Sequence, residues 1–119
     1  MTRIEAIDAL LTRVKAGEWD HRPNAEARVV FPYKSASADD LGLTARAAFE
    51  GSTDAALALI EAVLPGWEYG LNFDAHGEKY AFVGDGACFE TDEVYDKSHA
   101  RALLIATLEA LKAKEEADV

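Results

Sequence analysis

The sequence predicts an α+β fold, in which a short antiparallel sheet of about three strands, connected as a meander, packs with three helices. The predicted strands follow one another in the middle of the chain instead of alternating with helices, which separates the fold from a doubly wound α/β sheet. The length of 119 residues is typical of one domain, and half of the residues are hydrophobic, enough to form a core without a disulfide or a metal. We therefore expect a single domain over residues 1–119.

The first helix is predicted from the residues at its ends. Thr2 and Glu5 have the spacing of a capping box, which satisfies exposed backbone N–H groups at the start of a helix. Apolar residues then recur at helical spacing as far as Val14, and Gly17 is a candidate C-cap.

Residues 18–48 are predicted to be irregular. Arg-Val-Val-Phe at 28–31 predicts a short strand that ends at Pro32, because proline cannot donate a hydrogen bond to a sheet. The small and polar residues at 35–40 predict a loop, and residues 43–49 predict one or two helical turns.

The second half of the chain has clearer signals. A helix is predicted to begin in a run of candidate N-caps at 52–54 and to end at Pro65. From Trp67 to Phe73 apolar residues alternate with polar residues or glycine, which predicts an antiparallel strand with one face toward water. A turn then leads to a return strand at 79–83, so the two strands form a hairpin.

The last elements complete the predicted meander. Residues 84–86 are rich in glycine and predict a turn, and a third strand is predicted to follow at 87–93. Ser98 is a candidate N-cap for a long closing helix, in which Leu104 and other leucines at helical spacing form the buried side. The charged tail at 115–119 is expected to fray.

The charge of the chain limits its partners. Lys and Arg number 12 and Asp and Glu number 22, so the formal net charge is −10. This balance excludes a general nucleic-acid binder, which needs clustered cations to neutralise phosphates. The acidity lies in residues 51–119, which hold five cations and 14 acids, against seven and eight in residues 1–50.

The sequence predicts a cytoplasmic protein with no membrane association. Charged residues fall where the apolar segment of a signal peptide would begin, and no apolar run approaches the ~18 residues of a membrane span. The single cysteine, Cys88, excludes an internal disulfide and any site with two cysteine ligands.

No known catalytic, metal or cofactor motif is present in the sequence. There is no Gly-x-Ser-x-Gly elbow, and the glycines at 84–86 lack the Lys-Ser/Thr of a phosphate-binding loop. The three histidines are scattered, and the five acids at 85–96 lack the pattern of a calcium loop. We therefore predict no catalytic residue, no metal and no cofactor.

One cluster combines cations with aromatic side chains within residues 19–34. The candidate ligand-binding residues are Trp19, Arg22, Arg28, Tyr33 and Lys34. Guanidinium groups beside aromatic rings suit a planar anionic ligand such as a nucleotide. The alternative interpretation is structural: the aromatic rings belong to the core, and the cationic side chains cover apolar surface.

Three blocks of the chain carry a family resemblance. They are Arg-Ile-Glu-Ala-Ile-Asp-Ala-Leu-Leu at 3–11, the segment 49–67 with Phe-Glu-Gly-Ser-Thr-Asp at its start and Leu-Pro-Gly-Trp at its end, and the segment 100–111 that begins Ala-Arg-Ala-Leu-Leu-Ile-Ala. In this order they resemble a family of small proteins encoded by bacteriophages and prophages, the phage ABA sandwich domain. The resemblance implies a sheet layered between helices and a protein of the host-cell cytoplasm. It implies no catalytic residues.

Together these observations predict a non-enzymatic phage or prophage accessory protein that acts by binding. Its partner would be a host protein, for which the acidic half mimics nucleic acid, or a small nucleotide-like anion held by the 19–34 cluster. Two alternatives stay open: a small enzyme that acts on a nucleotide-like substrate, and a minor structural or assembly protein of the phage particle. A sheet face left partly uncovered would also serve as a contact between subunits of a homo-oligomer.

Overall fold

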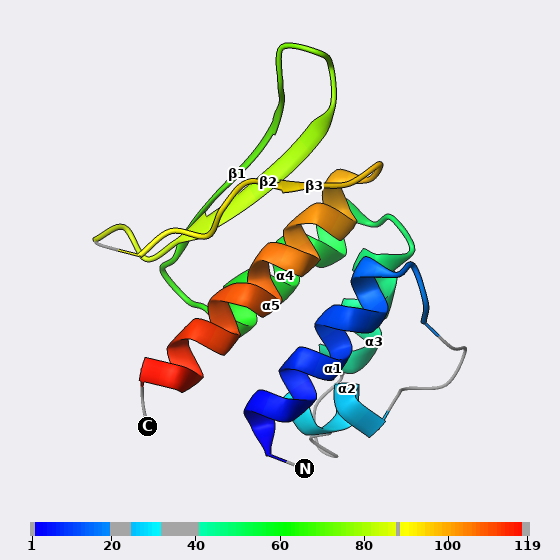
Figure 1. The fold of residues 1–119 in the computed structure, drawn as a ribbon, viewed down its shortest axis with the longest axis vertical. Coiled ribbons are helices and arrows are strands. Elements are labelled where there is room, and N and C mark those ends of the chain that lie inside the picture. Colours follow the sequence, from blue (N-terminus) through cyan, green and yellow to red (C-terminus); the bar gives the residue numbers. More distant parts are fainter. Residues whose placement is uncertain (1, 20–24, 32–40, 88, 118–119) are drawn as a thin grey trace.

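The computed structural model describes residues 2–19, 25–31, 41–87 and 89–117 and confirms the α+β fold with a three-stranded antiparallel meander (Figure 1). Its elements are α1 (Arg3–Lys15), α2 (Ala25–Val30), α3 (Leu41–Phe49), α4 (Thr53–Val63), β1 (Glu68–Phe73), β2 (Lys79–Gly84), β3 (Val94–Tyr95) and α5 (His99–Ala117). The described residues form five helices where the sequence predicts three: α3 is the short helical segment predicted at 43–49, extended to begin at Leu41, and α2 is an additional short helix. The predicted loop at 35–40 lies outside the described residues.

The three predicted N-caps are confirmed. The Thr2 hydroxyl accepts a hydrogen bond from the backbone N–H of Glu5 and donates to the Glu5 carboxylate at 3.0 Å, so Thr2 caps α1 and the two side chains contact each other. Ser52 and Ser98 accept backbone N–H groups at the starts of α4 and α5 in the same way. Gly17 ends α1 at φ +75°, a conformation that favours glycine. Local side-chain chemistry therefore determines where these helices begin and end.

Helix α5 lies at the centre of the molecule. It packs on the three strands on one side and on α1, α3 and α4 on the others (Figure 1). Residues 102–108 are all buried, as expected for a helix that is covered on every side. Among the described residues the middle layer is therefore a helix, whereas the resemblance to the phage family implies that the sheet lies in the middle.

Helices α1 and α5 are antiparallel neighbours, joined by three ion pairs that run along both helices. Arg3 pairs with Glu115, Asp8 with Lys112 at 2.8 Å and Lys15 with Glu109 at 3.0 Å. Exposed pairs of this kind each stabilise a fold by about 1 kcal/mol or less. They therefore contribute to the alignment of the two helices more than to the free energy of folding. Helix α5 continues to Ala117 and thus into the tail that the sequence predicts to fray.

The pairing of the strands assigns every side chain to one of two faces. Leu71 lies opposite Ala81, and Ala81 lies opposite Val94, so these residues share the face on which α5 packs. We call this the inner face; it consists of Tyr69, Leu71, Phe73, Lys79, Ala81, Val83 and Val94. The outer face points away from α5 and consists of Glu68, Gly70, Asn72, Tyr80, Phe82 and Tyr95.

The strand predicted at 28–31 is wrong. Residues 25–30 form α2, which packs against α1 and buries Ala27 and Val30 there, and Phe31 follows as part of the core. Adjacent valines favour a strand in isolation, but tertiary packing overrides such a preference when a helix buries the same side chains.

The strand predicted at 87–93 is also wrong, and β3 lies further along the chain at Val94–Tyr95. The Asp85 carboxylate accepts the backbone N–H groups of Ala87 and Phe89, at 2.8 and 3.2 Å. This side chain gives the backbone an alternative to sheet pairing and holds it in a turn. Among the described residues of this segment, one β-bridge pairs it with β2, between Glu90 and Gly84.

Candidate functional site

The outer face is the side of the sheet that no described helix covers (Figure 1). Tyr80 and Tyr95 lie against each other there with ring centroids 5.4 Å apart, and Tyr95 is 45% exposed. Phe82 lies across Gly70 on the neighbouring strand, where an added Cβ would come within 2.3 Å of the ring. Glycine at position 70 therefore lets the Phe82 ring lie flat on β1. The result is a row of aromatic side chains on an open sheet face.

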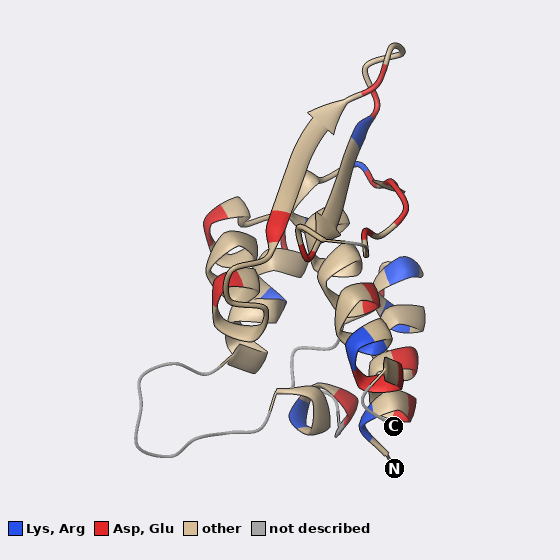
Figure 2. Cartoon of the chain, turned by 90° about the vertical axis from the view of Figure 1, so that its left-hand side faces the viewer, with Lys and Arg blue, Asp and Glu red and all other residues tan. Residues whose placement is uncertain are grey.

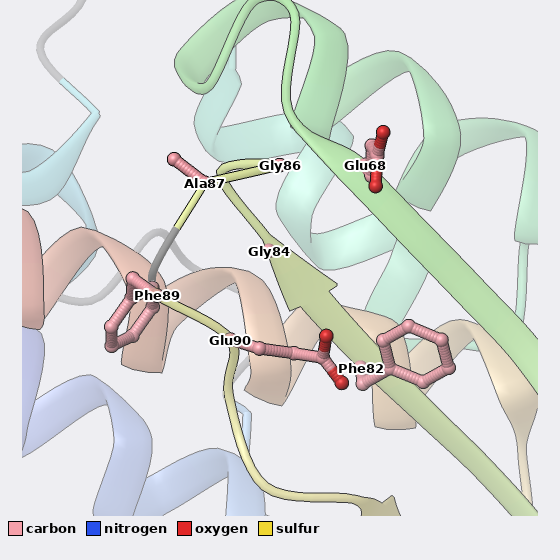
Figure 3. A pocket seen from close by; sticks show the side chains of 7 residues that line it. All are labelled: Glu68, Phe82, Gly84, Gly86, Ala87, Phe89 and Glu90. Atoms are coloured by element: carbon pink, nitrogen blue, oxygen red, sulfur yellow. The ribbon is translucent and has the colours of Figure 1, made fainter.

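A pocket of about 280 Å³ adjoins this row (Figure 3). It is lined by Glu68, Phe82, Gly84, Gly86, Ala87, Phe89 and Glu90. Glu68 comes from β1 and Glu90 from the loop after β2, so two carboxylates border the Phe82 ring from different segments. Carboxylates around an aromatic ring suit a cationic group rather than an anion.

The loop that forms this pocket spans residues 85–91, of which Cys88 lies outside the described residues. Its start is held by the Asp85 turn, and its end by Thr91, which is buried. The Thr91 backbone N–H donates to the Val83 carbonyl at 2.8 Å, and its hydroxyl accepts the Val83 N–H at 2.9 Å. These two bonds replace the sheet ladder that a longer third strand would make, and they fix the loop beside β2.

The segment around the pocket is negatively charged. Between residues 80 and 96 the chain contains five Asp and Glu residues and no Lys or Arg. Figure 2 shows acids at the end of the hairpin and along the loops beside the sheet. Tyr95 is part of this acidic surface: its hydroxyl donates to Glu93 at 3.0 Å, and this bond, with a smaller effect of burial, raises the pKa of Tyr95 to about 12.

The Glu93→Gln substitution is expected to lower the pKa of Tyr95 toward its ordinary value of 10. The folded-state pKa lies above the unfolded one, so the contribution of this bond to stability is complete below pH 10 and is lost as the pH rises through about 12. A difference titration of phenolate absorbance between the wild-type protein and E93Q measures the shift. Identical curves would contradict the hydrogen bond.

Two further clefts are less distinctive. One of about 420 Å³ lies at the end of the hairpin and includes Lys79 and Lys97 together with Glu78 and Asp96, so its charges are mixed. The other, of about 280 Å³, lies between the 85–91 loop and α5 and includes Lys112. The hydrogen bond from Lys112 to Asp8 raises the pKa of this lysine. Its ammonium group pairs with Asp8 at the contact between α5 and α1.

The structure describes only two residues of the predicted nucleotide cluster. Trp19 is half-buried against Phe49, with ring centroids 5.6 Å apart, and its buried Nε1 has no hydrogen-bond partner. Arg28 is half-exposed on α2. Arg22, Tyr33 and Lys34 lie outside the described residues, so an anion site formed by these five residues stays a prediction.

Sequence reasoning missed a structural role for Arg101. Its guanidinium donates two hydrogen bonds to the carbonyl of Phe49, at 3.1 and 3.3 Å, and lies 4.3 Å from the centroid of the Phe49 ring. A cation in this position neutralises the negative end of α3 and covers an aromatic ring at once. The signal in the sequence is a lone arginine between the apolar residues of the most buried helix.

Within the described ranges, no group of three His, Cys, Asp or Glu side chains is placed to hold a metal ion. None of the helices described combines the length and the apolar character that crossing a membrane requires.

Comparisons with protein-family models, with characterised proteins and with solved structures gave no match.

Proposed function

We propose that the protein acts by binding, and that it binds the basic surface of another protein with the outer face of its sheet. The exposed Tyr95 and the half-buried Tyr80 and Phe82 would supply the apolar centre of the contact, since aromatic residues are enriched at the centres of protein interfaces. The acids of the 85–91 loop and of β1 would form its rim and attract a positively charged partner.

The observation that carries this proposal is the combination of an uncovered aromatic face with a one-sided charge. An exposed aromatic row without charges would also suit self-association, and an acidic surface without aromatic rings is commonly only a solvated one. Here both occur on the same side of the molecule, and residues 80–96 contain no cation.

In the setting that the resemblance to phage-encoded proteins implies, the partner would be a host protein. A host surface that binds nucleic acid is rich in Lys and Arg, so an acidic face with aromatic rings can occupy such a surface in place of nucleic acid. We propose this class of partner because a surface that binds nucleic acid would suit both the negative charge and the aromatic side chains of the outer face.

Affinity capture with a matched pair of charge-reversed variants tests the proposal. The variant E90K/D92K changes the net charge by +4 in and next to the 85–91 loop, whereas E18K/E61K makes the same change at exposed positions in the loop after α1 and on α4. Proteins captured from a bacterial lysate by the wild-type chain are quantified by mass spectrometry. We expect basic proteins that E18K/E61K still captures and that E90K/D92K loses.

Raising the salt concentration should weaken the same captures, because the rim is electrostatic. Equal capture by both variants would contradict a contact on the outer face, and a captured set that is acidic would contradict the predicted partner class.

A further inference from the structure

We propose that the free edge of β1 pairs with an extended, basic segment of the partner and thereby adds a fourth strand to the sheet. This inference deepens the proposed function, on which it rests: it states how the partner is held and which of its segments is held. It concerns the edge of the sheet, which can be tested apart from the outer face.

β1 is an edge strand, because the strand order is β1-β2-β3. The hairpin shows which backbone groups point outward: Asp74 N–H donates to the Glu78 carbonyl at 2.9 Å, so the even-numbered residues of β1 bond to β2. Tyr69, Leu71 and Phe73 therefore direct their N–H and C=O groups to the free edge. The Phe73 N–H is satisfied by the Asn72 side chain at 2.9 Å.

The edge has few of the features that protect edge strands in other proteins. Natural edges are blocked by lysine, proline, a bulge or a covering segment. β1 contains neither lysine nor proline, its register with β2 is continuous over six residues, and it is the outermost strand in Figure 1. An unblocked edge of this length is a template for a further strand.

The side chains along β1 specify the chemistry of that strand. On the inner face, Tyr69 is 40% and Phe73 is 56% exposed, so an added strand with apolar residues there would cover them. Glu68 lies on the outer face at the start of β1. Asp74, whose Oδ1 accepts the backbone N–H groups of His76 and Glu78 in the hairpin turn, follows the end of β1, about 20 Å away at ~3.4 Å per residue. A segment of about seven residues that alternates apolar with basic side chains would match both rows.

A second copy of the chain fits the edge less well. Each copy carries a net charge of −10, and β1 offers no cation to meet the Glu68 of its partner. If Leu71 lay on the two-fold axis of a β1–β1 pair, Glu68 would lie opposite the acidic Asp74 of the other copy. Like charges directly opposite each other destabilise a pair of strands. The charge pattern thus favours a basic partner segment.

The experiment uses the 15N-labelled protein and a synthetic peptide, acetyl-Lys-Val-Lys-Val-Lys-Val-Lys-amide. In an added strand the valines lie opposite Tyr69, Leu71 and Phe73, and their N–H groups point to β1. The matched control is the same peptide with N-methylated valines, which keeps the charge and the side chains but cannot donate those bonds. We expect saturating peptide to slow hydrogen exchange at the Tyr69 and Leu71 amides, and N-methylation to weaken binding by at least about tenfold.

The remaining outcomes are distinct. Equal binding of both peptides, with chemical shift changes at Tyr80 and Tyr95, would overturn strand addition while it supports binding on the outer face. Protection of Tyr69 and Leu71 without peptide, growing with protein concentration together with a dimer mass, would identify a second copy as the occupant and overturn the proposal. Absence of any peptide binding at millimolar concentration would also overturn it, and the capture experiment then decides the proposed function separately.

Discussion

Replacing Leu104 by alanine is expected to lower the free energy of unfolding by about 3 kcal/mol. Leu104 is fully buried in α5, and α5 is enclosed by the sheet on one side and by helices on the others. A cavity there has no solvent-facing wall that could relax inward, so the lost contacts are not recovered.

Urea denaturation followed by circular dichroism measures this loss. The matched control is Leu43→Ala on α3, where the side chain is 52% exposed and the same truncation should cost less than about 1 kcal/mol. Equal losses in the two variants would contradict the central position of α5.

The Thr91→Val substitution is expected to cost about 2 kcal/mol, although the two side chains have nearly the same shape. Valine cannot accept the N–H of Val83, which is fully buried and would be left without a partner. The change should also loosen the 85–91 loop and thus the pocket beside Phe82. Binding through the outer face should weaken together with stability.

Thr12→Val supplies the control for this prediction. The Thr12 hydroxyl donates to the Asp8 carbonyl on the exposed side of α1, so water can replace the lost bond and the cost should stay within about 0.5 kcal/mol. If T91V were as stable as T12V, the bond between Thr91 and β2 would have no energetic role, and the loop would have to be fixed by other contacts.

The parts of the fold that the sequence predicts are those with local causes. Thr2, Ser52 and Ser98 are caps whose hydrogen bonds involve residues only three positions away. The alternation from Trp67 to Phe73 likewise reports a strand directly, because successive side chains of a strand point to opposite faces.

The parts that could not be predicted depend on distant partners. Whether residues 28–31 form a strand or join a helix is decided by α1, against which α2 buries its apolar side chains. Whether 87–93 joins the sheet is decided by the Asp85 carboxylate and by Thr91, two polar groups that compete with a ladder.

The candidate site could not be predicted from the sequence either, because it also depends on contacts between residues that are distant in the chain. The alternation along β1 shows which side chains lie on the same face of the sheet. It does not show which of them other parts of the chain bury. Phe73 and Tyr69 stay exposed because α5 covers only part of the inner face. The aromatic row on the outer face combines Tyr80 with Tyr95, which are 15 positions apart and meet only through the pairing of β2 with β3.

The central position of α5 has a consequence for the order of events during synthesis. The sheet, α1 and α4 all bury their apolar sides against a helix that begins at His99. A nascent chain that ends before this helix can form the caps, the hairpin and the contacts of α1 with α2 and of α3 with α4. The sheet, and the sides of α1 and α4 that face α5, have nothing on which to pack until α5 is present. The core around α5 can therefore form only after this helix has left the ribosome, and until then the uncovered apolar faces are exposed to chaperones.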